Sequence, residues 1–472
     1  MDTLRTTCIH DISTILDLYN RLLKIGSLEA IDCDHLISTW NYDKSLVNEI
    51  IAYINSTAHK QSIIRQMDYK FRANSVEKIM LPDTDLLNVL EGSPYGGLLE
   101  DDLRLNIEEL EKVLSSYDIK GYVKEIGKGP AVTRVLISLE ESTRKTKLWR
   151  FFEDIRERMD LLDIRMEAPV KEGSTFALEI PNKSLQTVSL RDALESEEFR
   201  NSSVTSFIVG KDVNNRIVIH DIAKLSNILI AGNTGSGKTM FLHSLIMSLL
   251  FKAIPDEIGL LLIDTGVVDL AVYNGIPYLI TPVVYEPRKA ILSLEKIVSE
   301  IISRYEALIQ FNAKDIASYN EKISLQFTTG TTPETQWKMK RLIIVIDDLH
   351  DLMMYGSREV EYCISLIAQT GKAVGVSVVV VTNHPNTSVI TQTIDLSLSS
   401  RIAFCVSFEV DSQTILNTKG SGWTKDGADM LLGNGDMLYF SQNTDAPMRI
   451  QGVYVSDEEI ERVVTYLKDQ DL

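Results

Sequence analysis

One short stretch of this chain has the residue types and the spacing that bind phosphate. It reads Gly-Asn-Thr-Gly-Ser-Gly-Lys-Thr and fits the pattern GxxxxGK[ST]. In such a loop, glycines let backbone N–H groups curl around phosphate oxygens without a Cβ in the way. The loop consists of Gly232, Asn233, Thr234, Gly235, Ser236, Gly237, Lys238 and Thr239. Together these residues predict a binding site for the phosphates of ATP.

The last two residues of the loop carry groups that can act on the phosphates. Lys238 can reach the β- and γ-phosphates, and the Thr239 hydroxyl can coordinate Mg²⁺. The run Asn227–Ala231 before the loop is typical of a strand, and an apolar helix follows the loop. The positive end of that helix dipole would point at the anion. We therefore expect ATP and Mg²⁺ as cofactors and favour this site over a glycine-rich turn without a ligand.

A nucleotide hydrolase also needs a carboxylate for the metal and a group that activates the attacking water. The strand-like run Leu342–Ile346 leads into Asp347 and Asp348. We predict that Asp347 holds Mg²⁺ through water and that Asp348 polarises the attacking water. The alternative is a pair of acids that only cap the next helix. Asn383 follows the predicted strand Val378–Thr382, so it could hydrogen-bond the γ-phosphate or the attacking water.

The elements that must position these residues alternate between strands and helices from residue 206 onward. Long amphipathic stretches such as Pro287–Phe311 separate most of the apolar runs. These runs are Asn227–Ala231, Gly259–Ile263, Leu342–Ile346, Val376–Val381 and Arg401–Val406. Such alternation indicates an α/β fold, with a mostly parallel sheet and helices on both faces.

Three regions are expected along the chain. Residues 1–80 read as a helical N-terminal region, with one apolar helix face in Asp11–Ile25, and they would serve packing or bind an unknown partner. Residues 81–200 read as a small α+β domain that opens with a Pro- and Gly-rich linker at Leu81–Gly97. Residues 201–472 form the α/β domain that carries the phosphate-binding loop.

Composition limits the class of protein. A length of 472 residues suits two or three domains, and 44% hydrophobic residues can bury a sizeable core. The net charge of −18 argues against a chain that coats nucleic acid or anionic membrane, although it permits a ring with a locally basic channel. The 4 cysteines are scattered, which disfavours a zinc site and fits a reducing, cytoplasmic compartment. The longest apolar run, Met240–Phe251, is shorter than the roughly 20 residues of a membrane span.

Several motifs, in a consistent order, resemble the FtsK/SpoIIIE family of DNA translocase motors. The resemblance extends over about residues 81–465. The motifs of the small domain are Gly129–Arg134 and Glu179–Asn182. Those of the larger domain are Gly210–Asp212, Asn227–Thr239, Gly275–Val284, Asp347–Met354 and Leu431–Tyr439. The resemblance implies a RecA-like P-loop NTPase core, a homo-oligomeric hexameric ring, and double-stranded DNA that passes through the ring under ATP hydrolysis. We expect neither the family's N-terminal membrane segment nor its C-terminal winged helix.

The chain departs from the family pattern at its proposed catalytic positions. The family's catalytic Glu corresponds to Asp348, which is one methylene shorter, and its Gln at the strand end corresponds to Asn383. The family's Arg that acts across subunits corresponds to Lys372, which cannot make a planar bidentate contact with phosphate. The family's Asp-Pro-Lys corresponds to the tripeptide at 264–266, Asp-Thr-Gly. These changes predict reduced turnover.

Positions that are basic in the family's pore loops lack a fixed positive charge in this chain. They correspond to His384, Asp395, Glu409 and Gln413. Because neutralised phosphates provide much of the affinity for DNA, we expect weak DNA binding. Three functions stay open: a ring ATPase that moves double-stranded DNA, a motor of the same family that acts on a protein, and an assembly factor that ATP switches with weak hydrolysis.

Overall fold

The computed structural model describes residues 69–71, 79–89, 112, 114–116, 121–139, 164–170, 175–182, 185–266, 269–329, 337–417, 427–441 and 446–471. The chain divides into the units Met1–Tyr69 and Lys70–Leu472, and nearly all described residues belong to the second unit. The helical region predicted for residues 1–80 lies outside the described residues, except for residues 69–71, 79 and 80.

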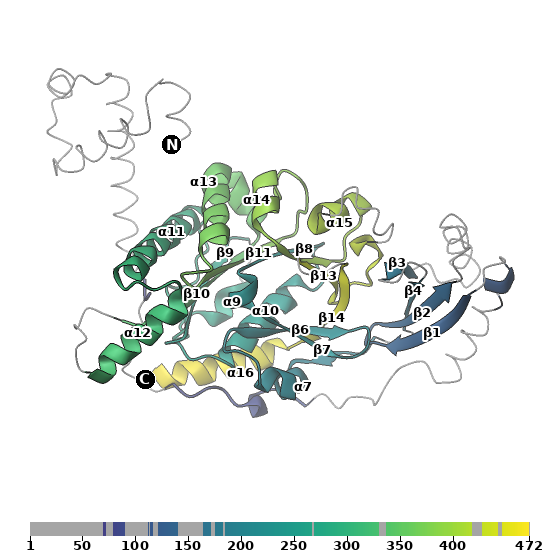
Figure 1. Cartoon of the computed structure of the whole chain (residues 1–472), viewed down its shortest axis with the longest axis horizontal. Helices are drawn as coiled ribbons and strands as arrows, with labels where there is room; N and C mark the ends of the chain where they lie inside the picture. The colour runs from purple at the N-terminus through teal and green to yellow at the C-terminus, as the bar shows by residue number, and fades with distance from the viewer. Residues whose placement is uncertain are drawn as a thin grey trace, which may run out of the picture. The chain divides into compact units, whose positions relative to one another are not determined.

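Within the described residues, a 10-stranded sheet forms the centre of the second unit (Figure 1). Its order is β7-β6-β14-β13-β12-β8-β11-β10-β9, with β5 paired to β14 at one side. The strands are β5 (Val188–Ser189), β6 (Ser206–Asp212), β7 (Ile217–Asp221), β8 (Asn227–Ala231), β9 (Ile258–Asp264), β10 (Arg341–Asp347), β11 (Val376–Thr382), β12 (Ser400–Phe404), β13 (Asp436–Ser441) and β14 (Met448–Tyr454).

The strands from β9 to β12 in this order run parallel, and those from β12 to β7 pair antiparallel. The short strand β5 pairs with β14 in parallel. The α/β class is therefore confirmed, while the expectation of a mostly parallel sheet holds only for the half that carries the phosphate-binding loop. Every residue of β8, β9 and β11 is buried. Continuous apolar runs form these strands because helices cover both faces of the parallel half.

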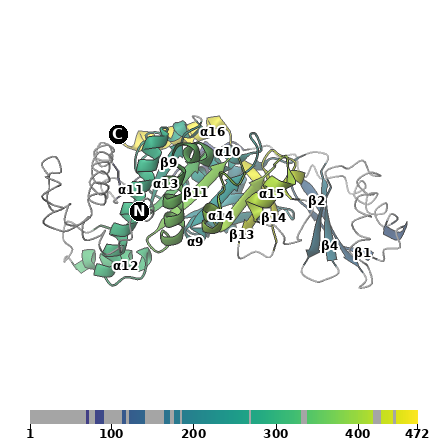
Figure 2. The same ribbon diagram turned by 90° about the horizontal axis from the view of Figure 1, so that it is seen from above.

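The helices lie in two layers. In Figure 1, α11 (Pro287–Gln310), α13 (Leu349–Thr370), α14 (Gln392–Ser397) and α15 (Glu409–Leu416) lie above the sheet. The helices α10 (Lys238–Leu250) and α16 (Asp457–Lys468) lie below it. Helices α11 and α13 pack side by side, as Figure 2 shows from above, and α13 packs on β11. The helix α12 (Ile316–Thr329) follows α11.

A second, four-stranded antiparallel sheet has the order β1-β2-β4-β3. Its strands are β1 (Gly121–Lys128), β2 (Val132–Leu139), β3 (Arg165–Val170) and β4 (Thr175–Pro181). The next elements belong with the large sheet, because β5 pairs with β14 and α7 (Leu190–Leu194) packs on β6 and β14. The short helix α8 (Glu197–Arg200) adds Phe199 to the same core. The domain division at residue 200 stays a prediction.

The described part of the predicted linker is anchored to α16. The 3₁₀ helix η2 (Thr84–Leu86) is followed by Leu87, which is 2% exposed. The Arg462 Nε donates to the Leu86 carbonyl at 2.8 Å, and the Asn88 N–H donates to Glu459 Oε1 at 2.7 Å. Residues 79–89 therefore form a strap on the last long helix, which the Pro- and Gly-rich composition did not indicate.

Among the described residues, no helix combines the length and the apolar character that crossing a membrane requires.

Candidate nucleotide site

The phosphate-binding loop joins β8 to α10, as the strand–loop–helix pattern predicted. Two of its glycines are required by space. Gly237 caps α10 with a φ of 118°, and a Cβ there would lie 2.7 Å from the Gly435 nitrogen. A Cβ on Gly232 would lie 2.6 Å from the Phe404 Cβ. The backbone of the loop therefore approaches two neighbouring segments more closely than any side chain would allow.

Hydrogen bonds from those neighbouring segments hold the loop in place. The Asn233 N–H donates to the Cys405 carbonyl at 2.9 Å, and the Asn233 Nδ2 donates to Ser407 Oγ at 2.8 Å. The Ser236 carbonyl accepts from the Gly435 N–H at 2.9 Å. Of these partners, Gly435 belongs to a family motif, whereas no sequence signal pointed to Cys405 or Ser407.

Lys238 lies inside the loop and is 5% exposed. Its Nζ donates to the carbonyls of Gly232 and Asn233 at 2.8 and 2.6 Å. Burial lowers the pKa of Lys238 to about 8, and the carboxylates of Asp347 and Asp348 act against that shift. The ammonium group is thus placed at the centre of the loop, as its proposed contact with phosphates requires.

The remaining residues of the phosphate-binding loop differ in how far they are exposed to solvent. Thr234 and Gly235 form an exposed tip, whereas Ser236 is buried and its Oγ donates to the Asn233 carbonyl at 2.7 Å. The Thr239 Oγ1 donates to Asp269 Oδ2 at 3.3 Å. The hydroxyl proposed for Mg²⁺ therefore lies beside a carboxylate that our sequence analysis did not select.

Asp347 ends β10 in register with Asp264 at the end of β9. Burial raises the pKa of Asp347 to about 7. Neighbouring carboxylates act in the same direction, and the Lys238 ammonium opposes them. These carboxylates belong to Asp264, Asp269 and Asp348. The position of Asp264 at a strand end was the signal that could have identified it.

Oxygen donors of this kind suit Mg²⁺. The Thr239 hydroxyl and the carboxylates of Asp347 and Asp269 are hard ligands. In the part of the chain that the structure describes, no group of three or more His, Cys, Asp or Glu residues is arranged to hold a metal by itself. Mg²⁺ is commonly bound through one or two carboxylates, with substrate phosphates and water completing the shell. The residues therefore fit a cation that arrives with the nucleotide.

Asp348 lies at the start of α13, where it caps the helix and lies close to Gly266. It caps the helix, because its Oδ1 accepts from the His350 N–H at 3.1 Å, and it has a φ of 63°. A Cβ on Gly266 would lie 3.5 Å from both Asp348 Oδ2 and Asp351 Oδ2. The capping contact that we set against catalysis is therefore present, and the role of Asp348 in activating water stays a prediction.

Substitution of Asp348 separates capping from catalysis. Asn tolerates the left-handed conformation and caps helices well, so Asp348→Asn should fold and bind ATP. Without a carboxylate that accepts a proton, its hydrolysis should fall about 10²–10⁴-fold. Asp348→Glu should keep or raise the rate of phosphate release. If Asp348→Asn hydrolyses ATP at the wild-type rate, the base lies elsewhere, and Asp351→Asn becomes the next variant to measure.

Asn383 and Lys372 lie at opposite ends of β11. Asn383 directly follows Thr382, which pairs with Ala231 at the end of β8, so Asn383 lies at the edge that carries the loop. The next residue, His384, packs its ring on that of His350 at 4.4 Å between centroids.

Lys372 precedes β11, and its Nζ donates to the Lys224 carbonyl at 2.8 Å. Lys224 lies just before the start of β8. The 5 residues of β8 span about 16 Å at about 3.3 Å per residue. The structure therefore brings Asn383 to the loop of its own chain and keeps Lys372 away from it.

Comparison with known proteins connects this site to a family. The model of the FtsK alpha domain matches residues 81–182, and that of the FtsK/SpoIIIE family matches residues 189–389. The DNA translocase FtsK of Clostridium tetani is 36% identical over 411 residues, which are 87% of this chain and 52% of that protein. The chain belongs to the FtsK/SpoIIIE family. The DNA translocase FtsK of Clostridium acetobutylicum is 38% identical over 82% of this FtsK/SpoIIIE chain and 49% of its own length.

This FtsK/SpoIIIE chain spans about half the length of the curated relatives it matches. Solved structures similar to it include the pCW3 conjugation coupling protein TcpA in monomer form with ATPγS. That match has a TM-score of 0.48 and 18% identity, and it covers 77% of this chain and 97% of TcpA. The cytoplasmic domain of the Type VII secretion ATPase EccC from Thermomonospora curvata has a TM-score of 0.49 and 18% identity, with 60% of this chain and 34% of EccC covered.

Proposed function

We propose that this chain is a motor ATPase that hydrolyses ATP to move double-stranded DNA. The supporting observation is the extent of the match to relatives that are named DNA translocase FtsK. The matches to the Clostridium proteins cover 82% and 87% of this chain, so they include both the small sheet and the phosphate-binding loop. The geometry of the loop supports the ATPase part of the proposal independently.

In this proposal each group of the site has one task. Backbone N–H groups of the loop and the Lys238 ammonium bind the phosphates. Thr239 and Asp347 hold Mg²⁺, which supplies positive charge beside the phosphates when it is bound. Asp348 takes a proton from the attacking water, and Asn383 orients that water or the γ-phosphate. Turnover is slow because Asp348 reaches one methylene less far than Glu.

We further propose a homo-oligomeric, hexameric ring in the cytoplasm. Lys372 lies at the edge of the sheet opposite the loop of its own chain, where it contacts the Lys224 carbonyl. A neighbouring subunit would have to supply its Lys372 for this residue to meet a γ-phosphate. ATPase activity per chain that stays constant on dilution to monomers would contradict the ring.

Two of the positions that correspond to the family's pore loops, Asp395 and Glu409, have different neighbours in the structure. An acid with no cationic partner at such a position would repel DNA. The Asp395 Oδ1 pairs with the Arg401 Nη1 at 2.6 Å, and Arg401 is 4% exposed. The negative charge of Asp395 is therefore offset within the fold. Glu409, in the first turn of α15, accepts a hydrogen bond at 2.9 Å from an uncharged partner, the Gln413 Nε2.

Substitution of Glu409 tests the DNA proposal. The unmodified chain should bind duplex DNA weakly, and Glu409→Lys should strengthen binding because a cation replaces an anion. Each added phosphate contact should steepen the slope of log K against log salt concentration by about 0.9. Binding and DNA-stimulated ATPase, measured across a salt series, provide the readout. Glu461→Lys on α16, below the sheet, is a control with the same charge change.

The same experiment decides between DNA and the other candidates. The acidic first turn of α15, with exposed Glu409 and half-buried Asp411, favours a protein substrate or an ATP-switched assembly role. ATPase activity that DNA never stimulates, in the unmodified chain and in Glu409→Lys, would exclude DNA translocation. Asp395→Lys does not serve as a test, because it would leave buried Arg401 without its carboxylate and destabilise the fold.

A further inference from the structure

Four charged side chains form a buried network between the two sheets. Each is only 1–2% exposed. They are Arg165 of β3, Glu179 of β4, Asp436 of β13 and Arg449 of β14. Charged groups are costly to bury unless they are paired and hydrogen-bonded. The proposed chemistry of the nucleotide site uses none of these four residues.

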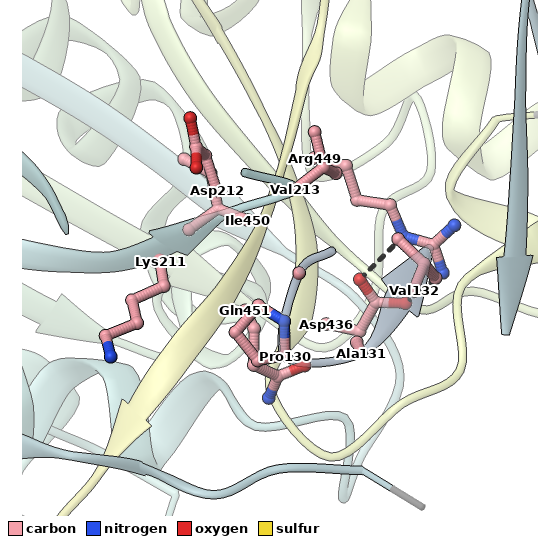
Figure 3. A pocket seen from close by; sticks show the side chains of 11 residues that line it. Pro130, Ala131, Val132, Lys211, Asp212, Val213, Asp436, Arg449, Ile450 and Gln451 are labelled. Carbon is pink, nitrogen blue, oxygen red and sulfur yellow. Dashed lines mark hydrogen bonds and ion pairs between the residues drawn. The ribbon is translucent and has the colours of Figure 1, made fainter. Parts of the chain in front are cut away.

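Arg449 is the residue that joins the two sheets. Its Nε and Nη2 donate to the two oxygens of Asp436 at 2.9 and 2.6 Å, which makes a bidentate pair. Figure 3 shows the two side chains facing each other. Its Nη1 donates to Glu179 Oε2 at 2.9 Å, although the two residues are 270 positions apart. Arg165 Nη1 donates to the same oxygen at 3.0 Å.

Glu179 is held in its ionised form by its two arginine partners. Burial alone would raise the pKa of Glu179, but the positive charges of Arg165 and Arg449 outweigh it and hold that pKa below its ordinary value. Glu179 is therefore an ionised carboxylate held by two guanidinium groups. Because bidentate and charge-assisted contacts fix geometry, a shift of Asp436 would be passed to Glu179.

The Asp436 end of the network directly follows Gly435, which is hydrogen-bonded to the phosphate-binding loop. Gly435 donates its N–H to the Ser236 carbonyl at 2.9 Å, and its own carbonyl accepts from Gly452 of β14 at 2.8 Å. The Asp436 Oδ2 also accepts from the Leu432 N–H at 2.9 Å. The segment that touches the nucleotide loop is thus the segment that Arg449 holds.

Near Glu179, the turn at residues 129–131 of the small sheet packs closely on Val213, which directly follows β6 of the large sheet. We call this contact the seam. In Figure 3, Pro130 and Ala131 of the turn before β2 line the same small pocket as Val213. A Cβ on Gly129 would lie 2.8 Å from the Val213 Cα, and Asn182 Nδ2 holds the Gly129 carbonyl at 2.9 Å. The cavity at the seam has a volume of only about 10 Å³, far below the roughly 300 Å³ of ligand pockets. Its tight packing suits a mechanical contact between the sheets better than a ligand site.

We propose that Arg449 is a positioning residue that couples the nucleotide loop to the small sheet through Asp436 and Glu179. This inference rests on nucleotide binding at the loop, as proposed above. A nucleotide that shifts Ser236 shifts Gly435 and Asp436, and Arg449 carries the change to β4. Coupling between two sites is reciprocal, so the placement of the small sheet also sets the affinity for nucleotide.

The variant Glu179→Gln tests the coupling at a residue far from any phosphate. We expect the Kd of a non-hydrolysable ATP analogue to rise about fivefold or more. A residue with a structural role alone would lower the folded fraction and leave the Kd of the folded protein unchanged. Glu300→Gln is a matched control, because Glu300 pairs with the equally buried Arg304 at 2.9 Å, away from the seam. That variant should keep the wild-type Kd.

Hydrogen–deuterium exchange of the wild-type chain supplies a second measurement that needs no variant. The analogue should slow exchange both in residues 431–435 and in β4, and Glu179→Gln should keep the first effect and lose the second. A folded Glu179→Gln with unchanged Kd, an equal rise in Glu300→Gln, or exchange in β4 that the analogue does not alter would each overturn the coupling. A wild-type chain that binds no nucleotide would overturn the proposed function as well, which separates the two failures.

Discussion

Lys238→Ala should abolish ATP hydrolysis and weaken nucleotide binding. The Lys238 Nζ is buried and lies within hydrogen-bonding distance of the Gly232 and Asn233 carbonyls, at the centre of the loop. Removal of its positive charge takes away a preorganised electrostatic contact with the β- and γ-phosphates. Loss of one such donor typically costs about 10²–10³ in rate, and we expect at least that loss here. Steady-state phosphate release and the Kd of a fluorescent ATP analogue measure the two effects.

Lys252→Ala is the matched control for this experiment. Lys252 also donates to backbone carbonyls, those of Phe199 and Arg200, but it lies beyond the far end of α10 from the loop. Its removal should leave the hydrolysis rate within about twofold, because no phosphate contact is lost. Full turnover in Lys238→Ala would exclude the loop as the catalytic nucleotide site.

Asp347→Asn should have two opposite effects, a loss of hydrolysis and a gain in stability. Hydrolysis should fall because the amide holds Mg²⁺ less well than a carboxylate does. Stability should rise because Asp347 is half-buried beside other acids and its pKa is raised to about 7. Ionisation of this side chain therefore opposes folding when no cation is bound. The gain should appear in the protein without Mg²⁺ and nucleotide.

The pH dependence of that gain has a definite sign. The unfolded carboxyl has a pKa near 3.9, so between about pH 4 and pH 7 the folded state binds more protons than the unfolded state. The free energy of unfolding of the wild type therefore falls as pH rises through this window, relative to Asp347→Asn. Above pH 7 the variant should be more stable by roughly 2–4 kcal/mol, and near pH 4 the two should match.

Thermal unfolding midpoints at pH 4.5 and pH 8 would measure the difference. Addition of Mg²⁺ with nucleotide should reduce the advantage of the variant, because the cation stabilises the ionised wild-type carboxylate. Equal midpoints at pH 8 without Mg²⁺ would show that Asp347 ionises without cost and would contradict the raised pKa.

The sequence could predict features that depend on local rules. The spacing of glycines and Lys238 identified the loop, because left-handed backbone and close approach require glycine at defined positions. Buried strands of the parallel half appear as apolar runs, so β8 to β12 were found within one or two residues of their ends. Carboxyl ends of parallel strands share one edge, which placed Asp347 and Asn383 beside the loop.

Other features depend on contacts between residues that the sequence keeps far apart. The register of β9 on β10 places Asp264 beside Asp347, and the chain after β9 brings Asp269 to Thr239. The ion pair with Arg401 offsets the negative charge of Asp395, and the sequence alone did not indicate this partner.

The sequence by itself determined the chemistry of the loop, the α/β class and the family motifs, because each follows from residue type and short spacing. Which charged side chains form ion pairs with one another was decided by the tertiary structure alone. Arg449 reaches Glu179 across 270 positions because β14 and β4 belong to different sheets that pack together, and no local pattern encodes that packing. The electrostatic surroundings of Asp347 arise in the same way, since its pKa depends on burial and on carboxylates that other strands and turns deliver.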